Sequence, residues 1–588
     1  MKHRLSAWSQ KIVSPITENP VFFTAIFIIN YIPSLLYWVV NYTSWLRLYA
    51  ILAAPVIFAL AYMLTFVVKQ LRKKEQSAKI VVYLLFGIPA LIETILVANF
   101  HTRFSALMFR LMAETNTNEA AEFLETYLFQ KETIITIVLF LVFGIVTYLF
   151  ENLLSNITIK IPRIFTKILA CCLVTTTALY LYRDINFLPK YFAKNIDEIM
   201  ATRPIRYGTP YVSLGYFFQS AKIHSLSFQD VDNLAHTLSK PTSATCHYNG
   251  NIILIIGESY SKNHSSLYGY TLHTNPQLQD EHDKSNLTLF KNVITSHNST
   301  SQSIQRMISL YNQDSETYWT NYQLFPPIYR SAGFKTLLIS NQESATEAEE
   351  WDCANYYLVA PKTSHFLFDW HTNEIKQWDM DLVRENADSI NKYKANRNLI
   401  IYHLMGQHTG YLERCPDNER IFTVSDYNHR KDITDKQKEY VAHYDNATRY
   451  NDKVVATILD QFREQDAIVI YLSDHGEEVY DYRDHMGRSH EPIVTPERAK
   501  YQFEIPFMIW MSDKYKQNHL DMVARIERSV DRPYMIDDLP HLMLDLAGIE
   551  CEWFDPTRSV INDKFNTKRK RLLLDSKQDY DEIMKGAK

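Results

Sequence analysis

The sequence predicts an N-terminal bundle of five transmembrane helices followed, from about residue 247, by an α/β domain with a mostly parallel central sheet. Long apolar runs occur only within residues 20–182, whereas short apolar runs alternate with helical stretches after residue 247. The 61 Lys and Arg residues are balanced by 66 Asp and Glu residues, so the chain lacks the basic excess of a nucleic-acid binder. These observations exclude a purely cytosolic protein and argue against a nucleic-acid partner.

Five apolar runs approach the roughly 20 residues that a helix needs to cross a bilayer. They are residues 21–40, 48–68, 80–100, 134–150 and 168–182. The last two are the shortest. The first run is not a cleaved signal peptide, because no small-residue cleavage site follows it and further spans come at once. We therefore predict a transmembrane domain over residues 1–182.

Basic residues in the short connections predict the orientation of these helices. They gather in the N-terminal tail, in residues 69–79 and in residues 151–167, which share one side of the membrane if all five spans exist. That side is expected to be cytoplasmic, so the chain beyond Tyr182 lies outside. If one weak run is instead a buried or interfacial helix, the orientation of the C-terminal part reverses.

Residues 183–246 are expected to form a linker between the two parts. Their aromatic and basic residues suit the headgroup level of a membrane, although a plain linker would have a similar composition. Four cysteines follow residue 245, namely Cys246, Cys353, Cys415 and Cys551. An oxidising compartment would permit two disulfides among them, and the sequence does not choose among the three pairings.

Three apolar runs of the α/β domain are followed by side chains that bind metal ions or phosphate. The runs and these residues are 251–256 before Glu258, 398–403 before His408, and 467–472 before Asp474 and His475. Two more runs, residues 335–340 and 503–510, are predicted to add strands to the same sheet.

Ligands of open α/β sheets bind beyond the carboxyl ends of the strands. Glu258, His408 and the Asp474-His475 pair are therefore expected to converge, although each motif alone is common. Together they offer carboxylate oxygens and imidazole nitrogens, a mixture that suits Zn²⁺ better than Ca²⁺ or Mg²⁺. The sequence thus predicts a metal site at this edge of the sheet.

A hydroxyl-rich segment, residues 295–303, offers a nucleophile for this site. It leads into the apolar-periodic residues Ile304, Met307 and Ile308, which indicates the start of a helix. Ordinary helix capping by Ser or Thr would give the same pattern. A helix start also gathers N–H groups that suit a phosphoryl group, and zinc would ease deprotonation of a hydroxyl there. The residue pattern does not distinguish Ser299, Thr300 and Ser301.

Seven motifs together resemble one family. They are Glu114–Ala120, Gly257–Ser259, Ser266–Tyr270, Phe290–Ser296, His403–His408, Ser473–Glu478 and Asp555–Val560. In this order they resemble the bacterial inner-membrane phosphoethanolamine transferases of the sulfatase/alkaline-phosphatase superfamily. The likeness is strongest to the branch that modifies the lipopolysaccharide core. It implies a sulfatase-like catalytic domain over residues 247–588, on the periplasmic side of the bacterial inner membrane, with a cytoplasmic N-terminus.

The resemblance also implies roles for particular residues. Glu258, Asp474 and His475 match zinc ligands, and Thr300 matches the nucleophile, which also contacts the metal. Three further matches are substrate-binding or second-zinc residues. They are His408, His485, with His490 as its competitor, and Glu477 as a carboxylate for the ethanolamine ammonium. The number of zinc ions stays open.

The implied reaction moves phosphoethanolamine from phosphatidylethanolamine to lipopolysaccharide through a phosphothreonine. A core sugar is favoured over lipid A as acceptor, because no cysteines bracket the nucleophile turn and the outer cysteines lack the disulfide spacing of the lipid A-modifying members. The sulfatase signature is also absent, since Cys415 is followed by Pro-Asp-Asn.

Three other functions stay open at this point. A phosphoglycerol transferase or a membrane-anchored phosphatase or phosphodiesterase would share the architecture. A structural membrane-assembly protein with an inactive site is the non-enzymatic alternative. The attachment point on the acceptor and the oligomeric state are not indicated by the sequence.

Overall fold

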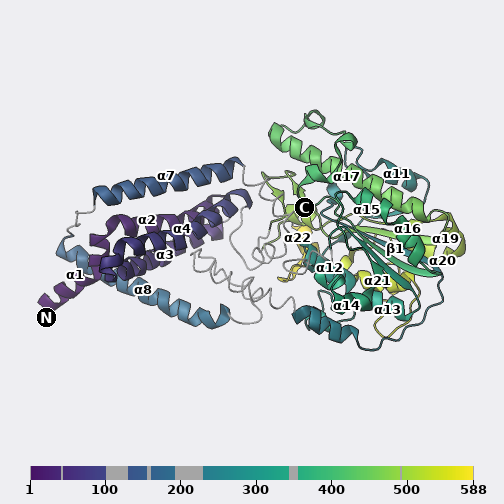
Figure 1. The fold of residues 1–588 in the computed structure, drawn as a ribbon, viewed down its shortest axis with the longest axis horizontal. Helices are drawn as coiled ribbons and strands as arrows, with labels where there is room; N and C mark the ends of the chain where they lie inside the picture. Colours follow the sequence, from purple (N-terminus) through teal and green to yellow (C-terminus); the bar gives the residue numbers. More distant parts are fainter. Residues whose placement is uncertain are drawn as a thin grey trace. The chain divides into compact units, whose positions relative to one another are not determined.

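The structure is a computed structural model that describes residues 2–40, 44–100, 130–154, 161–191, 229–343, 355–489 and 493–586. It contains two compact units: one is built by the N-terminal helices and the other is an α/β unit (Figure 1). The motif Glu114–Ala120 and residue His490 lie outside the described residues.

The N-terminal unit is helical. Its helices are α1 (Lys2–Glu18), α2 (Pro20–Val40), α3 (Ser44–Gln70), α4 (Glu75–Phe100), α7 (Lys131–Leu153) and α8 (Arg163–Tyr191). Among the described residues, four of them, α2, α3, α4 and α7, contain stretches long and apolar enough to span a membrane. These four match the first four predicted spans. The fifth, residues 168–182, lies within the continuous helix α8 and stays a prediction as a span.

Helix α7 shows why these helices need an apolar surrounding. Its side chains Leu139, Leu141 and Ile145 are each at least 60% exposed within the protein. Such a continuous apolar surface is unusual for a protein surface in water but is normal for one that faces lipid.

The α/β unit is built on a seven-stranded sheet with the order β2-β10-β7-β1-β6-β4-β5. The strands are β1 (Gly250–Gly257), β2 (Leu287–Phe290), β4 (Lys335–Ser340), β5 (Trp370–His371), β6 (Arg397–His403), β7 (Ala467–Ser473) and β10 (Phe507–Met511). β1 pairs in parallel with both β6 and β7, β4 pairs in parallel with β5 and β6, and β10 is antiparallel to its two neighbours. The predicted mostly parallel sheet is confirmed.

Helices cover both faces of this sheet because successive residues of a strand point to opposite sides. In β1, Ile252, Leu254 and Ile256 pack into one apolar cluster, while Ile253 and Ile255 pack into another. The first face is covered by α12 (Thr300–Ile308), α13 (Phe325–Ser331), α14 (Pro361–Leu367), α19 (Asp513–Asn518), α20 (Leu520–Glu527) and α21 (Leu539–Leu546). The second is covered by α11 (Pro276–Asp283), α15 (Asp379–Glu385), α16 (Ala387–Tyr393) and α17 (Asp435–Phe462) (Figure 1).

Short elements complete the unit at its edges. They are the paired strands β3 (Val293–Ile294) and β11 (Tyr534–Met535), β8 (Glu478–Val479) and β9 (Met486–Gly487), β12 (Leu572–Leu573) and β13 (Gln578–Asp579), with helices α18 (Pro496–Gln502) and α22 (Tyr580–Lys585).

Two predicted boundaries differ from the structure. The strand expected over residues 503–510 begins only at Phe507, because residues up to Gln502 form α18 and Pro506 has no N–H for a strand ladder. The expected linker also ends earlier than residue 246. From residue 229 the chain is helical, and Val231 and Leu234 are buried in the core of the α/β unit. Residues 192–228 lie outside the described part.

The two disulfides that an oxidising compartment would permit are not formed among the described cysteines. Cys246, Cys415 and Cys551 are all free, and Cys353 lies outside the described residues. Cys246 and Cys415 are buried in the apolar clusters on opposite faces of the sheet, so the sheet itself separates them.

Candidate active site

The sheet brings together two strand ends that are far apart in the sequence. β1 and β7 are direct neighbours, with Gly257 paired to Ser473, so the next residues, Glu258 and Asp474, leave the sheet side by side. The backbone N–H of Asp474 donates to the carbonyl of Gly257 at 3.0 Å and continues this contact beyond the sheet. The predicted convergence is therefore confirmed for the ends of β1 and β7, which carry Glu258, Asp474 and His475.

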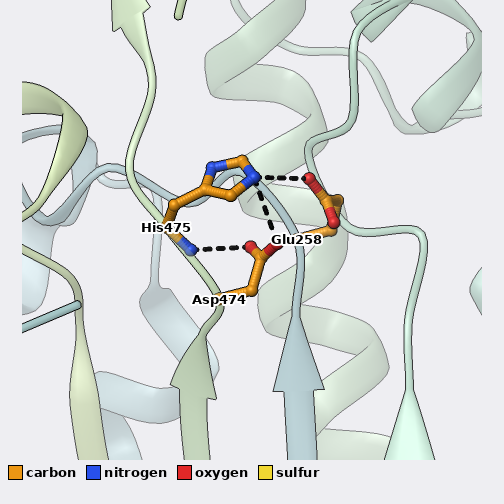
Figure 2. A group of neighbouring side chains, drawn as sticks. All are labelled: Glu258, Asp474 and His475. Carbon is orange, nitrogen blue, oxygen red and sulfur yellow. Dashed lines mark hydrogen bonds and ion pairs between the residues drawn. The ribbon is translucent and has the colours of Figure 1, made fainter. Parts of the chain in front are cut away.

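Glu258, Asp474 and His475 form a buried trio at this edge (Figure 2). Nε2 of His475 lies 3.2 Å from Oε1 of Glu258 and 3.1 Å from Oδ2 of Asp474. All three side chains have no exposed surface. One potential ligand atom from each residue lies within 4.8 Å of the others, which is the spacing of ligands around a single cation.

Hydrogen bonds orient two of these side chains. Oδ1 of Asp474 accepts from the backbone N–H groups of Ser259 at 3.1 Å and His475 at 2.7 Å. Oδ2 is buried and, apart from its 3.1 Å contact with Nε2 of His475, accepts no hydrogen bond from a described residue. Nδ1 of His475 lies 3.0 Å from the carbonyl of Gly476, which leaves Nε2 to face the carboxylates. Hydrogen bonds such as these, made by Oδ1 of Asp474 and Nδ1 of His475, fix the orientation of metal-binding side chains in proteins.

Electrostatics also favours a cation here. Burial would raise the pKa of Glu258, but His475, His408 and Arg488 hold it well below its usual range. Burial and the charge of Glu258 raise the pKa of Asp474. Burial would lower the pKa of His475, yet Asp474 and Glu258 raise it to about 9. Two buried carboxylates thus require positive charge beside them. The trio fits Zn²⁺ by its donor set, by its charge and by Oδ2 of Asp474, which has no partner outside the trio among the described residues.

Two hydroxyl side chains contact Glu258 of the trio: Ser259, which donates to Oε1 at 2.7 Å, and Thr300 from the predicted hydroxyl-rich segment. Thr300 is the first residue of α12, and its Oγ1 donates to Oε2 of Glu258 at 3.1 Å and lies 3.4 Å from Nε2 of His475. Ser299 precedes the helix, and its hydroxyl donates instead to Oε1 of Gln302 at 2.9 Å. The predicted helix start is confirmed, and the geometry separates Thr300 from Ser299, which the residue pattern alone did not.

The segment after β6 forms another wall of the site. The backbone N–H of Gln407 donates to the carbonyl of Glu258 at 3.0 Å. This contact brings His408, the next residue after Gln407, close to the trio. His408 is half-buried, and burial lowers its pKa to about 4, so the imidazole is neutral at physiological pH.

Gly406 allows this close contact. Its φ is +50°, and a Cβ at this position would lie 2.9 Å from the backbone nitrogen of Glu258. Gly406→Ala is therefore expected to destabilise the protein by about 1–3 kcal/mol and to displace Glu258, because both backbone strain and a backbone clash oppose it. Thermal unfolding and zinc content of the purified variant check this.

Gly548 offers a matched control. Its φ is +58°, but a Cβ there would meet nothing within 4 Å. Gly548→Ala should cost only about 1–2 kcal/mol, the strain of the left-handed conformation, and should leave zinc content unchanged. Equal zinc content in both variants would show that Gly406 does not support Glu258.

The loop after Asp474 carries the remaining predicted residues. Glu477 is fully buried, and its Oε1 accepts from the hydroxyl of Tyr411 at 2.9 Å. Burial raises the pKa of Glu477 to about 7, against the opposing charge of Arg488. His485 is buried in the turn between β8 and β9, where its carbonyl accepts from the N–H of Tyr480 at 2.9 Å.

Sequence reasoning missed two side chains that touch the trio. Nε2 of Gln342 lies 3.3 Å from Oε2 of Glu258, and Nη1 of Arg488 lies 2.7 Å from Nε2 of His475. Gln342 follows β4, so the same strand-end argument that gave Glu258 would have found it. Arg488 lies in an irregular loop, where spacing carries no comparable signal.

Comparisons with known proteins match this fold. Residues 250–549 match the Sulfatase family. Over 499 residues the chain is 30% identical to phosphoethanolamine transferase EptC of Escherichia coli K12, covering 82% of each chain. The crystal structure of the C-terminal periplasmic domain of Escherichia coli EptC, a complex with Zn, matches with 28% identity and a TM-score of 0.51, over 59% of this chain and 98% of that one.

A further solved structure extends the likeness in fold to the helical unit. It is the integral membrane protein lipooligosaccharide phosphoethanolamine transferase A of Neisseria meningitidis, with 17% identity and a TM-score of 0.60, over 92% of this chain and 97% of that one. The family match and the relatives show that this chain is an enzyme of the sulfatase class. The chain belongs to the Sulfatase family and, within it, to the phosphoethanolamine transferases.

Proposed function

We propose that this enzyme transfers phosphoethanolamine from phosphatidylethanolamine to a lipopolysaccharide acceptor, a core sugar in preference to lipid A, through a phosphothreonine on Thr300. The observation that carries this proposal is the hydroxyl of Thr300 bonded to Glu258 beside Asp474 and His475. The names of its relatives, phosphoethanolamine transferases, support the transferred group.

Glu258, Asp474 and His475 are proposed to hold Zn²⁺, with Thr300 in contact. When bound, zinc lowers the pKa of a neighbouring hydroxyl and offsets the charge of a phosphodiester. Glu258 holds Oγ1 of Thr300 in place through their 3.1 Å hydrogen bond. Whether a second zinc binds is left open; His408 and His485 are the residues proposed to serve it or to face the phosphate.

In the first step, Oγ1 of Thr300 forms a bond to phosphorus while the bond from phosphorus to the glycerol oxygen breaks. The proton of Thr300 passes to the leaving diacylglycerol through His408 or His485. In the second step an acceptor oxygen attacks the phosphothreonine, and Thr300 regains its hydroxyl. Glu477 is proposed to face the ammonium of ethanolamine as a buried carboxylate of the same loop, and its Oε2 also lies 3.4 Å from Nε of Arg488.

The membrane helices explain access to a lipid donor. We propose that residues 1–182 span the bacterial inner membrane with a cytoplasmic N-terminus and that the α/β unit is periplasmic. Attachment to the bilayer raises the effective concentration of the lipid donor at the site without any added contact.

The proposal predicts which lipid and acceptor the enzyme uses. Purified full-length protein with zinc should transfer phosphoethanolamine to lipopolysaccharide when given phosphatidylethanolamine, and should transfer no group from phosphatidylglycerol. Mass spectrometry of the lipopolysaccharide, with and without the protein, gives the attachment point. Release of phosphoethanolamine at the full rate without acceptor would identify a phosphodiesterase instead.

A further inference from the structure

Arg488 lies between the nucleophile turn and the buried trio. It follows strand β9, and its side chain is 16% exposed. Nη1 lies 2.7 Å from Nε2 of His475 and donates at 3.4 Å to the carbonyl of Asn298, two residues before Thr300. The guanidinium therefore spans the two elements between which a reacting phosphorus would have to lie.

A buried carboxylate fixes the direction of this guanidinium. Nε of Arg488 lies 3.4 Å from Oε2 of Glu477, and Oε1 of Glu477 accepts from the hydroxyl of Tyr411 at 2.9 Å. Glu477 has no exposed surface, so its position is set by packing and by this bond. The planar guanidinium of Arg488 is thus held by Glu477 at Nε. Its two outer nitrogens, Nη1 and Nη2, point away from Glu477.

The outer nitrogens retain donor capacity for a ligand. Nη2 makes no hydrogen bond with any residue of the described chain. Nε2 of His475 has one lone pair at most, and a bound metal ion would take it, so Nη1 would then need another acceptor. The same neighbourhood holds the carboxylates of Glu258 and Asp474, which repel the oxygens of an approaching phosphodiester.

We propose that Arg488 binds the phosphate group that Thr300 attacks, donating from Nη1 and Nη2 to its non-bridging oxygens. This inference rests on the proposed function. A guanidinium matches two phosphate oxygens with two parallel hydrogen bonds, which a lysine cannot do. Held by Glu477, Arg488 both offsets the repulsion from the carboxylates and aligns phosphorus with Oγ1 of Thr300. Donors fixed in this way before the reaction also stabilise the charge that develops on those oxygens.

The test compares wild type, Arg488→Ala and Arg488→Lys as zinc-loaded full-length proteins in detergent. The probes are phosphoethanolamine and inorganic phosphate, titrated calorimetrically, and metal analysis gives the zinc content. Arg488→Ala should keep its zinc and bind both probes about 10- to 100-fold more weakly, the effect of losing hydrogen bonds to a charged group. Arg488→Lys should recover part of the affinity, because it keeps the charge but not the fork.

Arg528→Lys is the matched control. Arg528 is 50% exposed and pairs with Asp563 at 2.7 Å, and it does not touch the trio. The Arg528→Lys protein should bind both probes as wild type does. Wild-type affinity for both probes in Arg488→Ala and Arg488→Lys would overturn the assignment. Loss of zinc from both would overturn it as well, because Arg488 would then serve His475 rather than the phosphate.

A separate measurement distinguishes this inference from the proposed function. Wild-type protein incubated with phosphatidylethanolamine is examined for a phosphoethanolamine adduct on Thr300. An adduct together with unchanged probe binding in Arg488→Ala overturns the role of Arg488 alone. Weakened probe binding without any adduct in wild type supports Arg488 as a phosphate ligand and overturns the phosphothreonine route.

Discussion

Thr300→Ala is expected to lower the rate of phosphoethanolamine transfer by at least about 10⁴-fold, because it removes the proposed nucleophile itself. Glu258 loses the hydrogen bond from Oγ1 but keeps its contacts with His475 and Gln342. Zinc content should therefore stay at the wild-type value, and stability should change by less than about 1 kcal/mol. Transfer rate, metal analysis and thermal unfolding of the same preparation check the three expectations.

Neighbouring substitutions make this result specific. Ser299→Ala removes the adjacent hydroxyl, which bonds to Gln302 and not to Glu258, so transfer should stay within about tenfold of wild type, an effect below about 1.4 kcal/mol. Thr300→Ser keeps a hydroxyl at the same place and should retain measurable transfer. An inactive Ser299→Ala together with an active Thr300→Ala would show that Thr300 is not the nucleophile.

Asp474→Asn is expected to abolish zinc binding and to lower transfer about a thousandfold, since several kcal/mol of charge stabilisation are lost with the metal. The amide keeps an oxygen to accept from the N–H groups of Ser259 and His475, so the loop should keep its shape. The substitution removes the negative charge, because an amide nitrogen replaces one oxygen of the buried carboxylate. Metal analysis and transfer rate measure both effects.

A chelator adds an independent readout of the same site. At free zinc about 1,000-fold above the Kd, binding stabilises the folded protein by about 4 kcal/mol. Chelation should therefore lower the Tm of wild type but leave that of Asp474→Asn unchanged.

Asp466→Asn, at the opposite end of β7 where Asp466 contacts His519 at 3.1 Å, should respond to the chelator as wild type does. Stoichiometric zinc in Asp474→Asn would contradict the assigned ligand set.

The strand ends were predictable from the sequence because parallel strands place their carboxyl ends at one edge. The apolar runs before Glu258 and Asp474 became β1 and β7, and their pairing follows from that rule. The predicted metal trio is likewise a consequence of two such ends lying side by side.

Contacts made by irregular segments were not predictable in this way. Arg488 reaches His475 from a loop whose path depends on the buried Glu477 and Tyr411, and neither periodicity nor spacing encodes that path. The sequence did not predict that the cysteines are free for a similar reason. Whether Cys246 and Cys415 approach each other depends on which face of the sheet each one packs against. Residue types alone do not distinguish Thr300 from Ser299, because both stand at one helix start.

We propose that Thr300, placed by Glu258 beside the trio, carries phosphoethanolamine covalently during transfer. The most direct measurement is intact-mass and peptide analysis of wild-type protein quenched after incubation with phosphatidylethanolamine and no acceptor. We predict a mass increase of one phosphoethanolamine group, located on the peptide containing Thr300 and removed when lipopolysaccharide is added. An adduct located on another residue, or transfer to lipopolysaccharide without any adduct, would contradict the account.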